Sequence, residues 1–109
     1  MQAISVLFFW LIVGHAVADY PLQGDFLAKA KNAWLPIAGV PWWIAMTAHC
    51  VIHAGAVVLV THSVVLGLVE FVLHFAIDVA KCSGSTNFEA DQLMHMVCKL
   101  AFAVVAGAA

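Results

Sequence analysis

The sequence predicts an all-α protein: a four-helix transmembrane bundle with a short interfacial helix between its first and second spans. Of its 109 residues, 65% are hydrophobic and only 9% are charged, and the mean hydropathy is +1.04. A soluble domain of this size cannot bury so much apolar surface. The apolar residues form four runs, each close to the ~20 residues that cross a bilayer. We expect one integral membrane domain over residues 1–109, with spans at about 3–20, 42–61, 63–81 and 88–107.

The first run and the segment after it predict a span followed by a surface helix. Pro21 ends the run, because proline disfavours helix at the residue before it. Gly24–Asn32 mixes apolar and charged side chains, which is typical of a short helix lying in the headgroup plane. Trp34, Trp42 and Trp43 follow, and tryptophan is suited to anchoring a chain at the membrane interface.

The remaining runs predict a hairpin and a final helix. Only Thr61–Ser63 separates the second run from the third, so the two should pack as an antiparallel pair. The polar segment Cys82–Asn87 joins the third run to the fourth. Thr86 and Glu89 fit a capping box that would start the last helix near Asn87.

The charge pattern excludes one class of partner and predicts an orientation. The chain has four lysines, no arginine and a net charge of −2, which does not favour nucleic-acid binding. Lys29, Lys31 and Lys81 lie in the two longer loops. The positive-inside rule places those loops in the cytoplasm and both termini outside. The three cysteines are scattered without a CxxC pair and predict packing rather than disulfides.

The few ionisable residues are concentrated inside the apolar runs, where they are costly and therefore indicate function. The stretch EFVLHFAID places Glu70, His74 and Asp78 on one helix face. The other three runs each carry an i, i+4 pair: His15/Asp19, His49/His53 and Asp91/His95. Counted from the lysine-bearing loops, these three pairs and the pair His74/Asp78 all fall in one leaflet. We therefore expect them to meet at one level.

The depths at which charged residues lie along the predicted spans also predict an ion pair. Glu70 lies eight residues deeper than Asp78, and Lys99 lies eight residues deeper than Asp91. If the two aspartates share a level, Glu70 and Lys99 share another about 12 Å further in. We predict that Glu70 pairs with Lys99, or that it turns toward the polar site instead.

Histidine and aspartate at helical spacing are typical ligands of zinc and other first-row metals. Facing helices that each present such residues build the metal sites of di-metal carboxylate bundles. We expect one or two Zn²⁺ ions, or another first-row divalent metal. The candidate metal ligands are His15, His49, His53, His74, Asp78, Asp91 and His95. Asp19 and Glu70 are candidate catalytic residues that would act as a general base.

Simpler interpretations exist for each pair taken alone. A lone HxxxH in an apolar helix is more often an interhelical hydrogen bond than a metal site. The pair His15/Asp19 could serve only to cap a helix end, and Asp91 could simply favour a helix N-terminus. His62, in the turn on the far side, is expected to be solvated. The shared depth of all four sets favours a common site.

Three segments carry a resemblance to a known family: HAVADYPLQGDFLAKAKN, EFVLHFAIDVAK and DQLMHMVCKLAFA. Their H-x3-D, H-x3-D and D-Q-x2-H motifs, spread over nearly the whole chain, resemble an uncharacterised family of small bacterial and phage polytopic membrane proteins. The resemblance implies a multi-pass protein, with a bacterial inner membrane as its location, but no activity. A weaker likeness, in motif style alone, is to membrane-bound metal-dependent hydrolases.

Three functions fit these observations. The first is a metal-dependent membrane hydrolase acting on an amphiphilic substrate, such as a lipid or a membrane peptide, near the bilayer surface. The second is a non-enzymatic module in which the cluster is a metal clamp or a hydrogen-bond network, and which works by self-association or partner binding. The third, a proton or metal-ion conductor, ranks last because the far leaflet is apolar.

Overall fold

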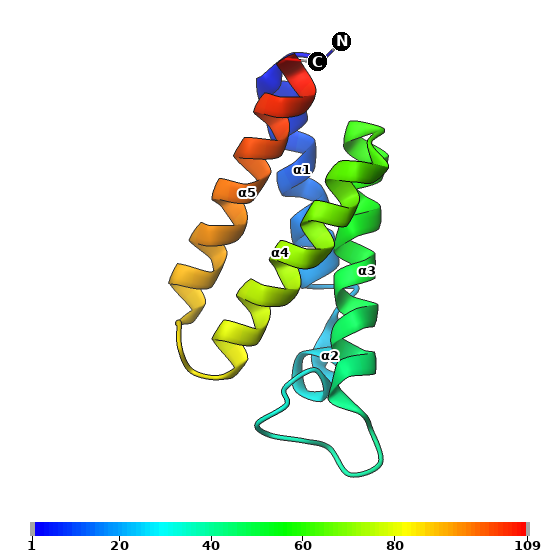
Figure 1. Ribbon diagram of the computed structural model, residues 1–109, viewed down its shortest axis with the longest axis vertical. Coiled ribbons are helices and arrows are strands. Elements are labelled where there is room, and N and C mark those ends of the chain that lie inside the picture. Colours follow the sequence, from blue (N-terminus) through cyan, green and yellow to red (C-terminus); the bar gives the residue numbers. More distant parts are fainter. Residues whose placement is uncertain (1, 109) are drawn as a thin grey trace.

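The computed structural model describes residues 2–108, and within that range every regular element is a helix (Figure 1). The four long helices begin and end within two residues of the predicted runs, so the all-helical prediction is confirmed. The bundle measures 47 × 22 × 22 Å. In chain order the helices are α1 (Ile4–Asp19), α2 (Gly24–Ala30), α3 (Trp42–Thr61), α4 (Val64–Cys82) and α5 (Phe88–Ala108).

Helices α3 and α4 form the predicted antiparallel hairpin. His62 ends α3 in the left-handed conformation, with φ 57°. Ser63 then caps α4, its Oγ accepting a hydrogen bond of 3.1 Å from the backbone N–H of Leu66. Helix α1 packs against α3 and α5, and α4 packs against α3 and α5, so the four long helices enclose one interior. Both ends of the chain lie at the same end of the bundle (Figure 1).

The opposite end is closed by α2 and the segment that follows it. The chain turns by 82° between α1 and α2, and it then passes beneath the bundle before α3 begins (Figure 1). Phe26, Trp34 and Trp43 are exposed there. The predicted short helix is therefore present, and its placement in the headgroup plane stays a prediction.

The start of α5 differs from the predicted capping box. The backbone N–H of Ala90 donates to Asn87 Oδ1 at 2.8 Å, so Asn87 provides the cap. The hydroxyl of Thr86 is buried without a hydrogen-bond partner. Asn87 stands three residues before Ala90, which is the spacing of a side-chain N-cap.

Two helices, α3 and α5, are long and apolar enough by themselves to cross a membrane. Helix α1 has only 16 residues and reaches the required length only when it is counted together with the bent α2. Helix α4 has 19 residues but carries Glu70, Asp78 and Lys81. The composition of the chain thus supports two or three spans rather than the predicted four, and α4 is not among them because its three charges are spread over most of its length.

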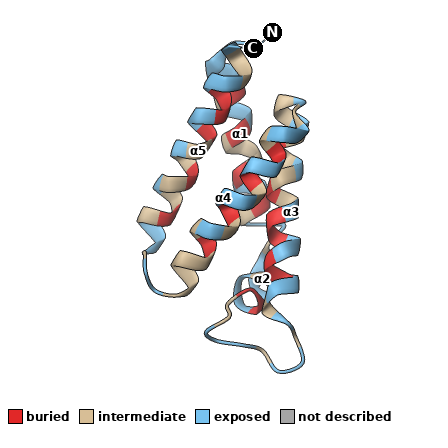
Figure 2. Cartoon of the chain, viewed as in Figure 1, coloured by how far each residue is buried: buried red, intermediate tan, exposed pale blue. Residues whose placement is uncertain are grey.

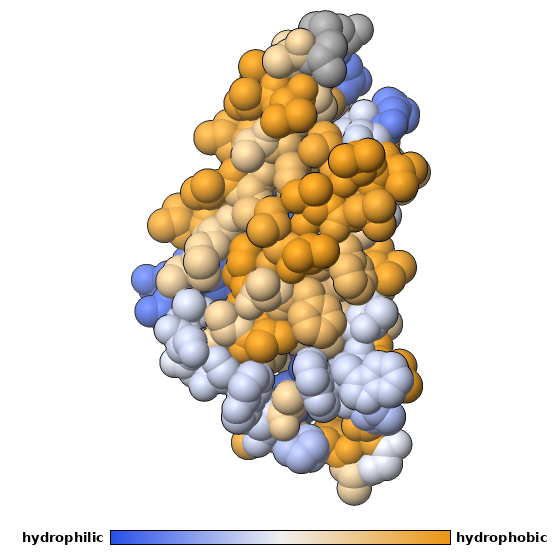
Figure 3. Space-filling view, viewed as in Figure 1, coloured by the Kyte–Doolittle hydropathy of each residue, from blue (hydrophilic) through white to orange (hydrophobic). Residues whose placement is uncertain are grey.

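The bundle is apolar outside and largely polar inside. Its surface is dominated by hydrophobic side chains over most of the length of α4 and α5, and polar groups gather at the α2 end (Figure 3). Buried positions follow one stripe along each long helix (Figure 2). Near the chain ends this interior is hydrophobic, built from Leu7, Leu11, Val57, Phe102 and Ala103. Toward α2 it becomes a cluster of ionisable side chains.

A glycine sets the distance between α3 and α4, and substituting it should loosen the hairpin. A Cβ on Gly67 would lie 2.4 Å from Val58 Cγ2 and 3.1 Å from the Ala54 carbonyl oxygen. We expect Gly67→Ala to lower stability by about 1–3 kcal/mol through overpacking. The matched control is Gly55→Ala, where nothing lies within 4 Å of the new carbon.

The two variants can be compared by thermal unfolding in detergent, followed by tryptophan fluorescence. Gly55→Ala should keep or raise Tm, because alanine favours helix over glycine. Equal Tm values for the two variants would contradict the close approach of the hairpin at Gly67.

Candidate metal centre

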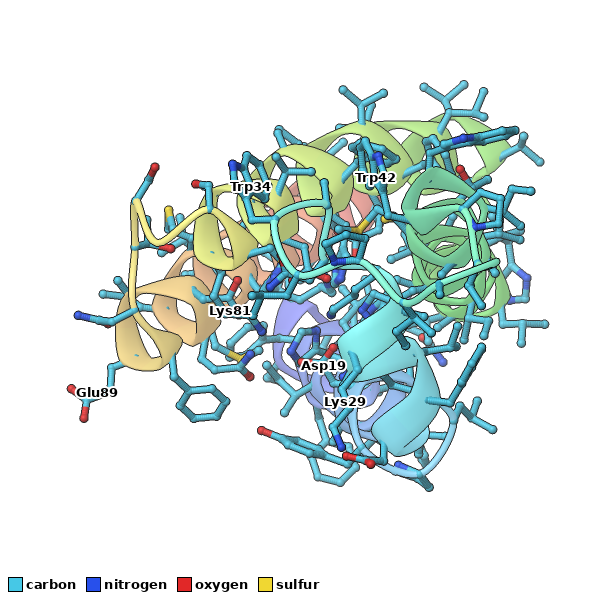
Figure 4. The ribbon with its side chains drawn as sticks, turned by 90° about the horizontal axis from the view of Figure 1, so that it is seen from below. Asp19, Lys29, Trp34, Trp42, Lys81 and Glu89 are labelled. Atoms are coloured by element: carbon cyan, nitrogen blue, oxygen red, sulfur yellow. The ribbon has the colours of Figure 1, made fainter. Side chains whose placement is uncertain are left out.

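All four long helices contribute ionisable side chains to one buried cluster. The four predicted pairs come together in one set of contacts. The five histidines of the cluster are each 3% exposed or less, Glu70, Asp78 and Asp91 are each 1% exposed or less, and the side chain of Asp19 is 10% exposed. Figure 4 looks along the bundle from the α2 end, where Asp19 and Lys81 lie toward the middle and Glu89 points away. The members are His15, Asp19, His49, His53, Glu70, His74, Asp78, Asp91 and His95.

Asp19 is at the centre of the contacts. Its Oδ1 lies 3.0 Å from Nε2 of His53 and 3.4 Å from Nε2 of His49. Its Oδ2 lies 3.3 Å from Nε2 of His15. One carboxylate on the last turn of α1 therefore touches imidazoles from α1 and α3, because i, i+4 spacing places each pair on the inward face.

His74 connects the α3 histidines to α4 and α5. Its Nε2 lies 3.1 Å from Nε2 of His49, and its Nδ1 lies 3.6 Å from Glu70 Oε2. Its ring stacks between those of His53 and His95, with centroid distances of 3.7 and 4.2 Å. The imidazole of His74 is thus held in orientation from both faces.

The geometry of four ligand atoms suits a tetrahedral metal ion. Nitrogen and oxygen ligands lie ~2.0–2.1 Å from zinc, so two such ligands of a tetrahedron lie about 3.3 Å apart. Three of the distances given above, at 3.0, 3.4 and 3.1 Å, are close to that edge length. The whole set, which consists of one atom each from Asp19, His49, His53 and His74, lies within 4.8 Å.

A second, overlapping set is formed by histidines alone. One nitrogen each from His15, His74 and His95 lies within 4.8 Å of the others. His95 Nε2 is also 3.5 Å from Asp91 Oδ1. Six of the nine residues in the cluster thus belong to sets that could hold a metal. Their role as ligands stays a prediction.

Two of the predicted ligands are engaged with lysines. Asp78 Oδ2 accepts a hydrogen bond of 2.5 Å from Lys31 Nζ, although it also lies 3.4 Å from His49 Nε2. Lys81 Nζ lies 3.6 Å from Asp78 Oδ1 and 3.7 Å from Asp91 Oδ2. Both aspartates face the cluster as predicted, but each has a cation beside it.

The predicted pair of Glu70 and Lys99 is present: the Lys99 ammonium donates to Glu70 Oε2 in the buried interior. Glu70 also lies beside Nδ1 of His74. Since its charge is already matched, this carboxylate is well placed to orient the His74 ring. Its proposed catalytic role stays a prediction.

The sequence did not identify two members of the site. Lys31 belongs to the segment Gly24–Asn32, which the sequence predicts to lie at the membrane surface, yet it is 3% exposed and donates hydrogen bonds to Asp78 and Gln23. Gln92 stands within the quoted D-Q-x2-H motif, but no role was assigned to it. Its amide bridges His15, Asp19 and Asp91. Only the motif offered a signal for Gln92, and none marked Lys31.

Asp19 differs from the other three carboxylates of the cluster in its charged neighbours. Glu70, Asp78 and Asp91 each have a lysine ammonium within 4.0 Å. Within residues 2–108, no lysine lies that close to Asp19, whose neighbours are three imidazoles and the Gln92 amide. With neutral histidines, three lysines against four carboxylates leave one negative charge in the cluster. The Asp19 side chain is 10% exposed and accepts hydrogen bonds from His53 and Gln92, so it is satisfied in part, and a cation at this position would balance its charge.

Residues outside the cluster behave as their positions suggest. His62 is exposed in the turn at the far end of the bundle, as predicted. Cys50 is buried, and all three cysteines are free. Within residues 2–108, neither of the two candidate metal sets includes a thiol.

The fold and site define a class: a small helical protein with an apolar exterior and a buried histidine–aspartate cluster able to accommodate a metal. The chain belongs to the family described as Protein of unknown function (DUF3307), whose model matches residues 7–108. The expected membership of an uncharacterised family is thus confirmed. No curated protein matches the chain. No solved structure matches it either.

The buried pair of Glu70 and Lys99 gives a test of the interior. We expect Lys99→Met to cost about 3–5 kcal/mol of stability, because it leaves the Glu70 carboxylate buried without its cation. The double variant Glu70→Gln/Lys99→Met removes both charges and should recover most of that loss. Denaturant unfolding in detergent measures both. A double variant as unstable as the single one would contradict the pairing.

Proposed function

We propose that this protein is an integral membrane metalloprotein. It would bind one first-row divalent ion, for which Zn²⁺ fits best, through Asp19, His49, His53 and His74. The observation that carries the proposal is the position of the Asp19 carboxylate. It has no lysine partner within the described residues, and its neighbouring ligand atoms are spaced close to the edges of a zinc tetrahedron.

We further propose that α1, α3, α4 and α5 all cross the bilayer. The charges on α4 argue against a span only if they face lipid. Glu70 and Asp78 are instead buried and matched by lysines, and Lys81 lies near the end of the helix. The positive-inside rule would place the ends joined by α2 and by the α4–α5 loop in the cytoplasm of a bacterial cell.

More specifically, we propose that the protein is a metal-dependent hydrolase that acts on an amphiphilic substrate. A zinc ion supplies a water whose pKa is near neutral and polarises the bond to be broken. Charge favours this chemistry, since one divalent cation together with one hydroxide anion would bring the cluster from its single negative charge to neutrality. Around that ion, Asp19 would be both ligand and proton acceptor, and Glu70 would orient His74 through Nδ1.

The position of the cluster near one end of the bundle suggests which class of substrate it would act on. The site lies at the end of the bundle that carries α2 and the exposed aromatic residues Trp34 and Trp43. Aromatic side chains of this kind are suited to the headgroup region. A lipid or a membrane peptide would then present its polar group to the cluster while its apolar part remained in the bilayer.

One observation favours a structural role instead. Four protein ligands would complete a tetrahedron, and His49, His53 and His74 are each 1% exposed or less. Closed four-ligand sites of this kind are typical of structural zinc. In this alternative the metal clamps the bundle, and the apolar outer faces bind lipid, a partner or a second copy.

Metal content tests the proposal directly. Protein purified in detergent and dialysed against trace zinc should retain at least one equivalent by mass spectrometry, and a chelator should lower its Tm. His49→Ala and His53→Ala should each lose the ion, whereas the exposed His62→Ala should keep it. Absence of retained metal, with Tm unchanged in chelator, would overturn the proposal.

Cobalt substitution separates the two roles. If the site keeps an open position, adding azide should shift the visible absorption of the Co²⁺ protein, because azide can enter that position. A spectrum that does not respond to azide, together with intense tetrahedral absorption, would support the structural clamp and contradict the hydrolase.

A further inference from the structure

The second oxygen of Asp19 faces residues that the four-ligand set does not use. While Oδ1 contacts the α3 histidines, Oδ2 lies 3.3 Å from His15 Nε2 on the other side of the carboxylate. We infer that Asp19 is a bridging ligand and that a second divalent cation site lies on its Oδ2 side. This inference rests on the metal site proposed above, and it extends that site to two ions.

The remaining ligands of the second site come from α5. His95 Nε2 and Asp91 Oδ1 lie 3.5 Å apart, close to the ligand separation expected around one ion. His15 and His95 belong, together with His74, to a set whose ligand atoms lie within 4.8 Å of one another; Asp19 adjoins this set through His15, and Asp91 adjoins it through His95. The second ion would be held by Asp19 Oδ2, His15, His95 and Asp91.

Unpartnered buried atoms support this location. Asp91 Oδ1 is buried and has no hydrogen-bond partner, although the residue is only 1% exposed. A carboxylate oxygen left in this state is costly unless a cation or donor satisfies it. Its position beside His95 Nε2 points it into the proposed site.

The amide of Gln92 links the groups that the second ion would join. Its Nε2 donates to Asp19 Oδ2 at 3.2 Å and to Asp91 Oδ2 at 3.0 Å, and its Oε1 lies 3.2 Å from His15 Nε2. This amide thus connects three of the proposed ligands. With the ion present, it would remain as a hydrogen-bond donor that orients the two carboxylates.

The arrangement matches what two-metal sites require. Ions that act together on one reacting group lie ~3.5–4 Å apart, and a carboxylate whose two oxygens each bind one ion gives such a spacing. Two ions sharing Asp19 would therefore place a water and the bond to be broken between two cations. The hydrolase proposed above would then use two ions as Lewis acids, and Asp19, with both oxygens bound, would serve as a ligand rather than as the proton acceptor.

Charge predicts that the two ions bind unequally. The first divalent cation meets a cluster with one excess negative charge, whereas the second meets an excess of positive charge before any hydroxide is counted. Lys81, which is already included in this balance, lies 3.7 Å from Asp91 Oδ2 and places positive charge next to the second ion. A metal titration should therefore show two steps, with the second ion binding more weakly.

The test is a Zn²⁺ and Co²⁺ titration of the full chain in detergent. Wild type should bind two ions, and Asp91→Asn should bind one. Glu89→Gln, which removes an exposed acid from the same helical turn, should still bind two. Electron paramagnetic resonance of the Co²⁺ protein should show exchange coupling between the ions in wild type and its loss in Asp91→Asn.

Saturation of wild type at one ion, two uncoupled ions, or two ions retained in Asp91→Asn would each overturn the second site. A single ion that is lost in His49→Ala leaves the metalloprotein proposal standing, whereas no bound ion removes both. If Asp91→Asn fails to fold, the stoichiometry and the coupling in wild type decide the matter.

Discussion

The structure depends on one constraint: because the exterior is apolar, the ionisable side chains on the inward faces of the long helices must find their partners inside the bundle. The interior accordingly contains three lysines that match three carboxylates, five imidazoles, and the carboxylate of Asp19, which touches three of those imidazoles. In a low-dielectric interior, breaking one member of such a network leaves a buried charge or donor unsatisfied. This requirement fixes the rotation and the depth of each helix more tightly than contacts between aliphatic side chains could.

The same constraint explains how the two ends of the bundle differ. Near the chain termini the four helices meet through an aliphatic and aromatic core that includes Leu11 and Phe102. Toward α2 they meet through the polar cluster, which Lys31 closes from below through its bond to Asp78. The end near the termini therefore contributes only apolar packing. The end near α2 contains the candidate site, whose residues are positioned on rigid helices. Such a site can be preorganised for a cation without help from mobile loops.

Most of this architecture could be predicted from helix periodicity and from the number of residues that separate each polar side chain from the lysine-bearing loops. The run lengths gave helix ends within two residues, and i, i+4 spacing placed the histidines and aspartates on inward faces. Equal depth predicted the pairing of Glu70 with Lys99. What could not be predicted depends on contacts between distant segments. Lys31 looks like any lysine of an amphipathic helix until the chain beneath the bundle brings it to Asp78, and the link from Gln92 to α1 requires the relative rotation of two helices.

The central claim is that Asp19 and the histidines around it form a nitrogen- and oxygen-ligated metal centre inside the bundle. X-ray absorption at the zinc edge of the detergent-purified protein tests it most directly. The account predicts a first shell of nitrogen and oxygen at about 2.0–2.1 Å, with outer-shell scattering from several imidazoles. A sulfur shell near ~2.3 Å, or a spectrum without imidazole scattering, would contradict it.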